Sequence, residues 1–202
     1  MSTAPRPTSN DWQVERLAGA LGAEIRGIAL ADANDADIAT IEALLVEHMV
    51  LFFPDQELFE LAASQGGVAD EWHTDITFRP DPALMSILKM VKCHAYGGDT
   101  MWSNLCQAFD ELSEPMQELC CGLTALHDAT PHNRPEQMAV HPVVRVHPVS
   151  GRKALYVNEH FTRRIVEMNA SESDMLLRHL TNWVQKPRFT IRYRWRENTI
   201  AM

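Results

Sequence analysis

The sequence contains the segment Trp-His-Thr-Asp-Ile-Thr-Phe at residues 72–78, which combines strand-forming residue types with a histidine and an aspartate two positions apart. Its aromatic and β-branched residues are typical of a β-strand, so we expect a strand over 72–78. Side chains two positions apart on a strand project from the same face, which would place His73 and Asp75 together. An imidazole beside a carboxylate supplies two of the three ligands of the two-histidine, one-carboxylate triad that binds non-haem Fe(II).

A His-x-Asp triplet also occurs often as a surface pair or as a hydrogen-bonded histidine. The triplet alone therefore does not establish a metal site. Apolar residues recur at helical or strand spacing in several further segments. We expect helices over 35–48, 57–63, 105–112, 114–123 and 171–184, and strands over 49–53, 83–91, 143–146, 153–157 and 189–195, with Ser171 capping the last helix. Strands and helices do not alternate regularly, which favours an antiparallel sheet or sandwich with helices on its outside.

Composition limits the classes of function. The chain has 202 residues and a formal net charge of −9, which argues against binding to a nucleic-acid backbone. The basic segment 188–196 alternates with apolar residues and is interpreted as the exposed face of a strand. The four cysteines lack zinc-type spacing, no signal peptide is recognisable, and no apolar run reaches the ~20 residues that span a bilayer. We therefore expect a cytoplasmic protein without a membrane or nucleic-acid partner.

Several motifs occur in a fixed order around the triplet. They are Leu21–Ile25, Val50–Phe53, the segment 72–78, Gly97-Gly98-Asp99-Thr100, His141–Arg145, His147–Gly151 and Leu155–Glu159. In this order and spacing the chain, from about residue 17 to its end, resembles the taurine dioxygenase (TauD/TfdA-like) family of Fe(II)- and 2-oxoglutarate-dependent dioxygenases.

The resemblance implies a mainly β fold with flanking helices, the double-stranded β-helix or cupin-like jelly roll. It implies Fe(II), with 2-oxoglutarate as co-substrate and dioxygen as oxidant. His73 and Asp75 would ligate the iron and carry the catalysis, and Thr100 would hydrogen-bond a carboxylate of 2-oxoglutarate. Phe161 and Asn158 would contact the substrate, although core packing and a hydrogen bond at a strand end account equally well for these two residues.

The sequence also departs from the family pattern. The family's second histidine ligand, and the arginine that pairs with 2-oxoglutarate, follow a Trp-Asp-Asn-Arg segment that would begin beyond Met202. The stretches near 56–57 and 129–140 are shorter than in the family. We therefore expect a polar tail over 1–10 and one jelly-roll domain over 11–202 that lacks loop segments and a C-terminal part. None of His94, His127, His132, His141, His147 and His160 is expected to replace the missing ligand.

Three functions remain open at this point. The resemblance favours a dioxygenase that hydroxylates a small, anionic organic molecule of the taurine or sulfonate, alkyl sulfate or aryloxyalkanoate class, with release of succinate and CO2. The first alternative is a jelly-roll binding protein that has lost the iron site. The second is a zinc hydrolase built on His73, Asp75 and another histidine, for which no general base can be assigned. Relatives of this kind favour a homo-oligomer, either a dimer or a tetramer.

Overall fold

The structure is a computed structural model that describes residues 12–56 and 70–202. Within these residues the chain forms two compact units, and each is described by itself. The first unit combines parts of Met1–Ser64 with Ile87–Trp102 and Thr190–Met202, and the second combines parts of Gln65–Ser86 with Ser103–Phe189. The tail expected over 1–10 and the helix expected over 57–63 lie outside the described residues.

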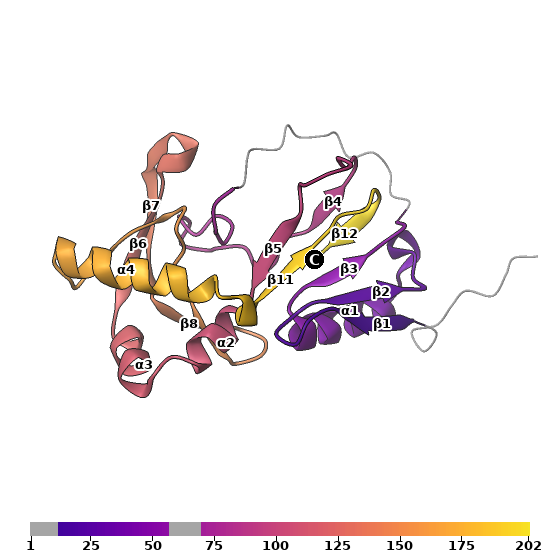
Figure 1. Cartoon of the computed structure of the whole chain (residues 1–202). Helices are drawn as coiled ribbons and strands as arrows, with labels where there is room; N and C mark the ends of the chain where they lie inside the picture. Colours follow the sequence, from indigo (N-terminus) through magenta and orange to yellow (C-terminus); the bar gives the residue numbers. More distant parts are fainter. Residues whose placement is uncertain (1–11, 57–69) are drawn as a thin grey trace, which may run out of the picture. The chain divides into compact units, whose positions relative to one another are not determined.

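A five-stranded sheet forms the first unit (Figure 1). Its order is β1-β2-β3-β12-β4, in which β2 and β3 run parallel and the other neighbours run antiparallel. The strands are β1 (Gln13–Arg16), β2 (Ala23–Arg26), β3 (Leu51–Phe53), β4 (Leu88–Met90) and β12 (Thr199–Ala201). Strands from both ends of the described chain therefore meet in one sheet.

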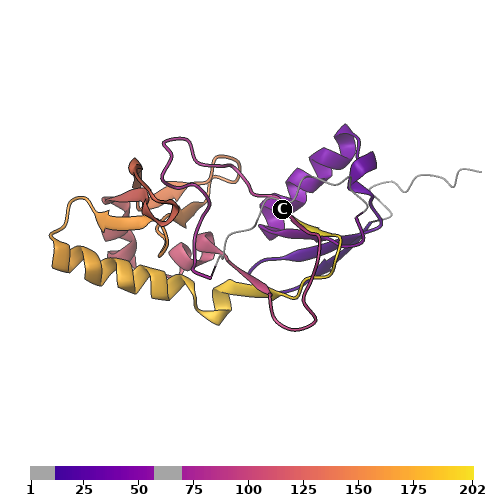
Figure 2. The ribbon, with the colours of Figure 1, turned by 90° about the horizontal axis from the view of Figure 1, so that it is seen from above.

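The central strand β3 is buried on both faces. Leu51 and Phe53 pack into a cluster with Ile41 of helix α1 (Asp35–His48), whereas Phe52 packs into a second cluster on the opposite face. This division follows from the period of two along a strand. Helix α1 covers the first of these faces (Figure 2). It begins with a capping box in which Asn34 and Asp37 bond each other's backbone N–H groups.

The second cluster also receives the strand β11 (Thr190–Tyr193), which pairs with β5 (Thr100–Ser103). In the segment after Thr190 the apolar side chains of Ile191, Tyr193 and Trp195 are buried, and the arginines between them are exposed. The predicted exposed basic face is therefore confirmed. The rings of Phe52 and Tyr193 stack with centroids 3.7 Å apart, so β3 and β11 are joined through aromatic contacts.

The second unit contains a three-stranded antiparallel sheet and a two-stranded ribbon. The sheet has the order β10-β6-β7, and the ribbon pairs β8 with β9. The strands are β6 (Thr124–Ala129), β7 (Arg134–Pro142), β8 (Val144–Val146), β9 (Lys153–Leu155) and β10 (Thr162–Ile165). The 3-10 turn Thr130–His132 joins β6 to β7 in a hairpin. The pairing expected between 143–146 and 153–157 is confirmed, with Val144 opposite Leu155.

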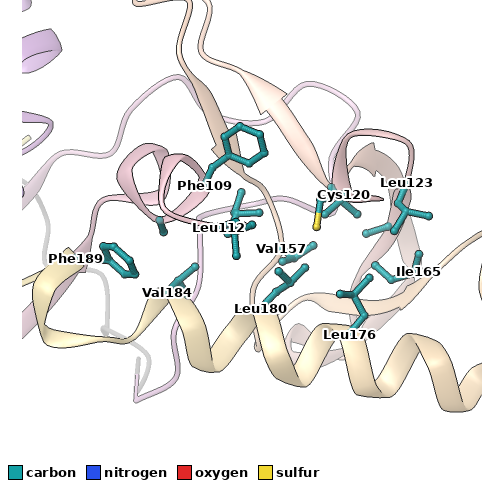
Figure 3. Close-up of a cluster of buried hydrophobic side chains, with 14 residues drawn as sticks. Phe109, Leu112, Cys120, Leu123, Val157, Ile165, Leu176, Leu180, Val184 and Phe189 are labelled. Carbon is teal, nitrogen blue, oxygen red and sulfur yellow. The ribbon is translucent and has the colours of Figure 1, made fainter. Parts of the chain in front are cut away.

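Helix α4 (Ala170–Val184) supplies one wall of this unit's core. Its buried residues Leu176, Leu180 and Val184 point into one cluster, with Leu176 beside Ile165 and Leu180 beside Val157, as Figure 3 shows. Helix α2 (Leu105–Asp110) contributes the buried Ala108 and Phe109 to this cluster. Helix α3 (Glu114–Cys121) adds the buried Cys120 to the same core. Four residues at helical spacing on one face of α4 are buried, as its sequence period predicted.

Several predicted elements differ from the structure in their bounds or caps. Helix α4 begins one residue earlier than expected, and its cap is Asn169 rather than Ser171, because Asn169 and Glu172 form a capping box. The strand expected over 83–91 is confined to Leu88–Met90, because only this part finds a partner strand, β12. In the described part of the chain, no helix combines the length and the apolar character that crossing a membrane requires.

The hairpin β6–β7 carries two buried histidines, His127 and His141. Burial lowers the pKa of His127 from its ordinary value of 6.5 to about 4, and the nearby His141 contributes in the same direction. The folded protein therefore holds His127 as a neutral imidazole.

The stability of the protein should decrease on mild acidification because of His127. Between pH 6.5 and about 4 the unfolded chain binds a proton on this imidazole that the folded chain does not. The contribution of His127 to the free energy of unfolding is therefore fully present above pH 6.5. About 3 kcal/mol of it is lost as the pH drops through this window. Urea denaturation at a series of pH values should show a flatter profile for His127→Gln. The exposed His179→Gln serves as a control and should keep the wild-type slope; equal slopes for wild type and His127→Gln would contradict the prediction.

Candidate functional site

The segment 72–78 is not a strand, which corrects the expectation from its residue types. Residues 72–74 have no regular structure and residues 75–78 form a turn. Ile76 adopts φ 49°, in the left-handed region that β-branched residues rarely enter. With this φ the backbone at Ile76 cannot continue as a strand. The β-propensity of the segment is a weak preference, and the tertiary contacts of the next residue, Thr77, override it.

The turn nevertheless brings the two predicted ligands together. His73 Nε2 and Asp75 Oδ1 lie 3.4 Å apart, and both side chains are partly exposed. The remaining polar atom of each group is already engaged. His73 Nδ1 lies 2.9 Å from the carbonyl oxygen of Glu71, and Asp75 Oδ2 accepts a hydrogen bond from the Ser86 hydroxyl. Nε2 and Oδ1 are thus the two atoms that face each other.

This arrangement fits two ligands of a transition metal. A metal-ligating histidine typically donates its other ring N–H to a carbonyl or carboxylate, which fixes the tautomer and the ring orientation. The bond from His73 Nδ1–H to Glu71 is of this kind and leaves the Nε2 lone pair available. Imidazole nitrogen and carboxylate oxygen are also the ligand types of the Fe(II) triad. The donor pair therefore fits the iron that the resemblance implies.

The electrostatics of the pair follow from the same contact. The hydrogen bond to Asp75 raises the pKa of His73, against the opposing effect of burial. The hydrogen bond to His73 lowers the pKa of Asp75, again against burial. Both shifts favour the charged pair, in which the proton on Nε2 occupies the place that a metal ion would take. Metal binding at this pair would release that proton.

The described residues do not supply a third ligand. Within residues 12–56 and 70–202, no group of three histidine, cysteine, aspartate or glutamate side chains is placed to hold a metal ion. One other histidine, His160, lies close to the pair, with its ring centroid 5.7 Å from that of His73. Its Nδ1 is bound to Glu71 Oε2 at 2.8 Å. The expectation of a histidine ligand beyond Met202 stays a prediction.

Phe161 and Asn158 lie in the same unit as the pair. Phe161 is 3% exposed and meets the rings of His73, His132 and His160 edge-on, so it forms the wall beside the donor pair. Asn158 is buried: its amide donates to Thr77 Oγ1 at 3.3 Å and accepts from Phe161 N–H at 2.8 Å. Its bonds hold the segment that carries Phe161, and the substrate contacts assigned to both residues stay predictions.

Thr100 belongs to the first unit, at the start of β5. Its Oγ1 accepts a hydrogen bond of 2.8 Å from the indole Nε1 of Trp195. Asp99, the preceding residue, forms an ion pair of 2.7 Å with Arg192. Because the indole can only donate, the hydroxyl proton of Thr100 stays available for a further acceptor, such as a carboxylate oxygen. The geometry around Thr100 is therefore compatible with the role that the resemblance implies.

Sequence reasoning missed the buried polar residues behind the turn. Thr77 bonds with His127 and Asn158, and His141 bonds with the backbone of the turn. The sequence alone raises these histidines only as possible metal ligands. The burial of His127 could have been predicted, because it lies two residues from Ala125 and from Ala129 and shares with them the buried face of β6.

Comparison with known proteins places these features in a family. Residues 60–202 match the profile described as "Taurine catabolism dioxygenase TauD, TfdA family". An alpha-ketoglutarate-dependent sulfate ester dioxygenase of Pseudomonas putida is 34% identical, over all of this chain and 83% of its own length. An alkylsulfatase of Acinetobacter baylyi is 30% identical, over all of this chain and 80% of its own length. The alignment with each relative extends over 254 positions, so each carries residues that this 202-residue chain lacks.

The fold is similar to solved structures as well. A putative alpha-ketoglutarate-dependent taurine dioxygenase from Burkholderia xenovorans superposes with a TM-score of 0.86 at 33% identity, covering 95% of this chain and 82% of the other. This likeness confirms the expected mainly β jelly-roll fold with flanking helices. Membership of the family implies 2-oxoglutarate as co-substrate, with Fe(II) and dioxygen. On the profile match, the two relatives and the fold together, the chain belongs to the TauD/TfdA family of alpha-ketoglutarate-dependent dioxygenases.

Proposed function

We propose that this dioxygenase uses His73 and Asp75 as iron ligands and hydroxylates a small anionic substrate of the sulfate ester class. The observation that carries the site assignment is the geometry of the donor pair: Nε2 and Oδ1 face each other at 3.4 Å while Nδ1 and Oδ2 are held from behind. The substrate class is supported by two relatives: the Pseudomonas putida protein is named a sulfate ester dioxygenase, and the Acinetobacter baylyi protein is named an alkylsulfatase.

The chain's own residues would position the reactants. The Glu71 carbonyl fixes the ring of His73, and the Ser86 hydroxyl fixes the carboxylate of Asp75. Thr100 would donate its hydroxyl proton to 2-oxoglutarate, because its oxygen already accepts from Trp195. Phe161 would present an apolar edge beside His73, suited to the carbon chain of a substrate. Bound Fe(II), with 2-oxoglutarate and dioxygen, supplies the oxidation itself, and the protein supplies orientation and exclusion of water.

The chemistry of a sulfate ester accounts for a desulfating outcome. One oxygen atom of O2 would be inserted into the C–H bond next to the ester oxygen, and the other would enter 2-oxoglutarate as it loses CO2 to become succinate. The resulting α-hydroxy sulfate ester breaks its C–O bond to sulfate, giving an aldehyde, sulfate and a proton. Sulfonates and aryloxyalkanoates also carry an oxidisable C–H beside a heteroatom, and the same reaction would release sulfite or a phenol from them.

Assembly and location are part of the proposal as well. We infer a homo-oligomer, a dimer or a tetramer, that acts in the cytoplasm on a small molecule and has neither a nucleic-acid nor a membrane partner. The acidic net charge of −9 supports the exclusion of nucleic acid.

Iron and co-substrate binding should depend on both members of the donor pair. Anaerobic addition of Fe(II) and then 2-oxoglutarate to the intact protein should produce the weak visible metal-to-ligand absorption band of the chelate. His73→Ala and Asp75→Ala should each abolish the band, because each removes a ligand, while the exposed His179→Ala should retain it. A folded wild-type protein that gives no band would refute the iron site and favour the binding-protein alternative. A site that prefers Zn(II) and yields no band would favour the hydrolase.

The hydroxyl of Thr100 should contribute to 2-oxoglutarate affinity without affecting iron. Thr100→Val keeps the size of the side chain and removes the donor, so the Kd for 2-oxoglutarate should rise roughly ten- to a hundredfold, as expected for a lost hydrogen bond to a charged group. Thr100→Ser should restore most of the affinity. Calorimetric titration of each iron-loaded variant measures this effect, and a Thr100→Val protein that binds 2-oxoglutarate as tightly as wild type would exclude the assigned contact.

Substrate class can be decided by product formation. With Fe(II), 2-oxoglutarate and dioxygen, a medium-chain alkyl sulfate should stimulate succinate release and yield sulfate in equal amounts. Taurine and an aryloxyacetate of similar size should stimulate release more weakly. Succinate and sulfate can be quantified by ion chromatography. Preferential turnover of taurine or of the aryloxyacetate would reassign the substrate class while leaving the dioxygenase function intact.

A further inference from the structure

The turn that carries Asp75 is held in a conformation its sequence does not favour. Ile76 has φ 49°, and a β-branched residue in this region is strained. Such conformations persist only where surrounding contacts determine them, and they concentrate at functional sites. Ile76 itself is only partly buried, against a small cluster of Phe78, Ala129 and Phe161. Stronger contacts are therefore expected at the neighbouring residues.

Those contacts converge on Thr77, which is completely buried. Its Oγ1 lies 3.0 Å from Nδ1 of His127 and 3.3 Å from Nδ2 of Asn158. Its carbonyl oxygen lies 2.9 Å from Nε2 of His141, which also lies 3.0 Å from the carbonyl oxygen of Arg79. Both acceptors of His141 are carbonyls, so Nε2 carries the proton and donates to the turn.

The three partners are themselves fixed. His127 belongs to β6 and His141 to β7, the two strands of the hairpin, and their rings pack edge-on with centroids 5.5 Å apart. Asn158 is held by its bond from Phe161 N–H, and its own N–H donates to Thr162 Oγ1 at 2.9 Å. Thr77 is thus attached to the hairpin and to the segment that carries Phe161, through buried and hydrogen-bonded side chains.

We propose that Thr77 is a positioning residue that aims Asp75 at His73, with His127, His141 and Asn158 as the buried groups that hold it. The inference rests on the proposed role of His73 and Asp75 as iron ligands. Thr77 lies two residues beyond Asp75 and on the far side of the strained Ile76, so fixing Thr77 fixes the direction in which the Asp75 carboxylate leaves the turn. Thr77 itself touches neither iron nor substrate.

A purely structural role for Thr77 makes a different prediction. If the buried hydroxyl served only stability, its loss would lower the free energy of unfolding and leave the metal affinity of the folded protein unchanged. If it positions Asp75, metal affinity falls in the protein that remains folded. Residues that orient metal ligands typically change metal affinity by 10- to 100-fold when they are mutated.

The experiment compares Thr77→Val with Thr77→Ser in the intact protein by anaerobic calorimetric titration with Fe(II). Valine has the shape of threonine without the hydroxyl, and serine keeps the hydroxyl. Thr77→Val should bind Fe(II) roughly 10- to 100-fold more weakly, and Thr77→Ser should recover most of the affinity. Thr124→Val is the matched control, because it removes a hydroxyl of β6 that bonds to the exposed Glu167; its Fe(II) affinity should equal that of wild type.

A second variant keeps the test decisive if Thr77→Val does not fold, as judged by circular dichroism. His141→Phe keeps a ring packed against His127 and Tyr156 but removes the donor to the two carbonyls of the turn; it too should weaken Fe(II) binding. Wild-type Fe(II) affinity in folded Thr77→Val, or in His141→Phe if only this variant folds, would overturn the positioning role. Absence of Fe(II) binding by the wild-type protein would instead refute the proposed function.

Discussion

The candidate site depends on one contact, the approach of His73 Nε2 to Asp75 Oδ1 at 3.4 Å. Both side chains are partly exposed, and exposed ion pairs contribute little to stability. The stability of the folded chain therefore does not explain why this pair is held from behind by Glu71 and Ser86. The proposed iron site would give the arrangement a use, because Nε2 and Oδ1 face a shared position and a metal ion binding there would displace the proton of Nε2.

Residues around the pair include features that lower the stability of the fold. Within the described part of the chain, His127 Nε2 and the hydroxyl of Tyr156 are buried without a hydrogen-bond partner. Both lie in the layer behind the turn, with ring centroids 5.8 Å apart. Burying an unpaired polar atom costs free energy, and Ile76 adds backbone strain in the same region. Local rules of stability are most often violated next to functional sites.

The sequence predicted the regular elements well where local rules govern them. Helix α1 has the bounds expected from its apolar spacing, and Asn34 provides the cap that such a helix needs. β3 was recognisable as a continuous apolar run, because both of its faces are buried. The segment 72–78 was misread as a strand, since its residue types favour a strand and nothing local indicates the positive φ of Ile76. The proximity of His73 and Asp75 was still predicted, because a turn can bring residues i and i+2 together as a strand does.

The buried layer behind the turn could not be predicted in this way, because its contacts join residues 50 to 81 positions apart. No periodicity in the segment 72–78 indicates that Thr77 will meet His127 or Asn158. The strand β6 does contain a usable clue, since its alternation places His127 on a face that is otherwise alanine. A histidine on a core face needs a polar partner, and a threonine is among the few uncharged side chains that can both donate to it and accept from it. A histidine on a core face therefore indicates a buried hydroxyl nearby. In this protein the hydroxyl belongs to Thr77, in the turn that carries Asp75.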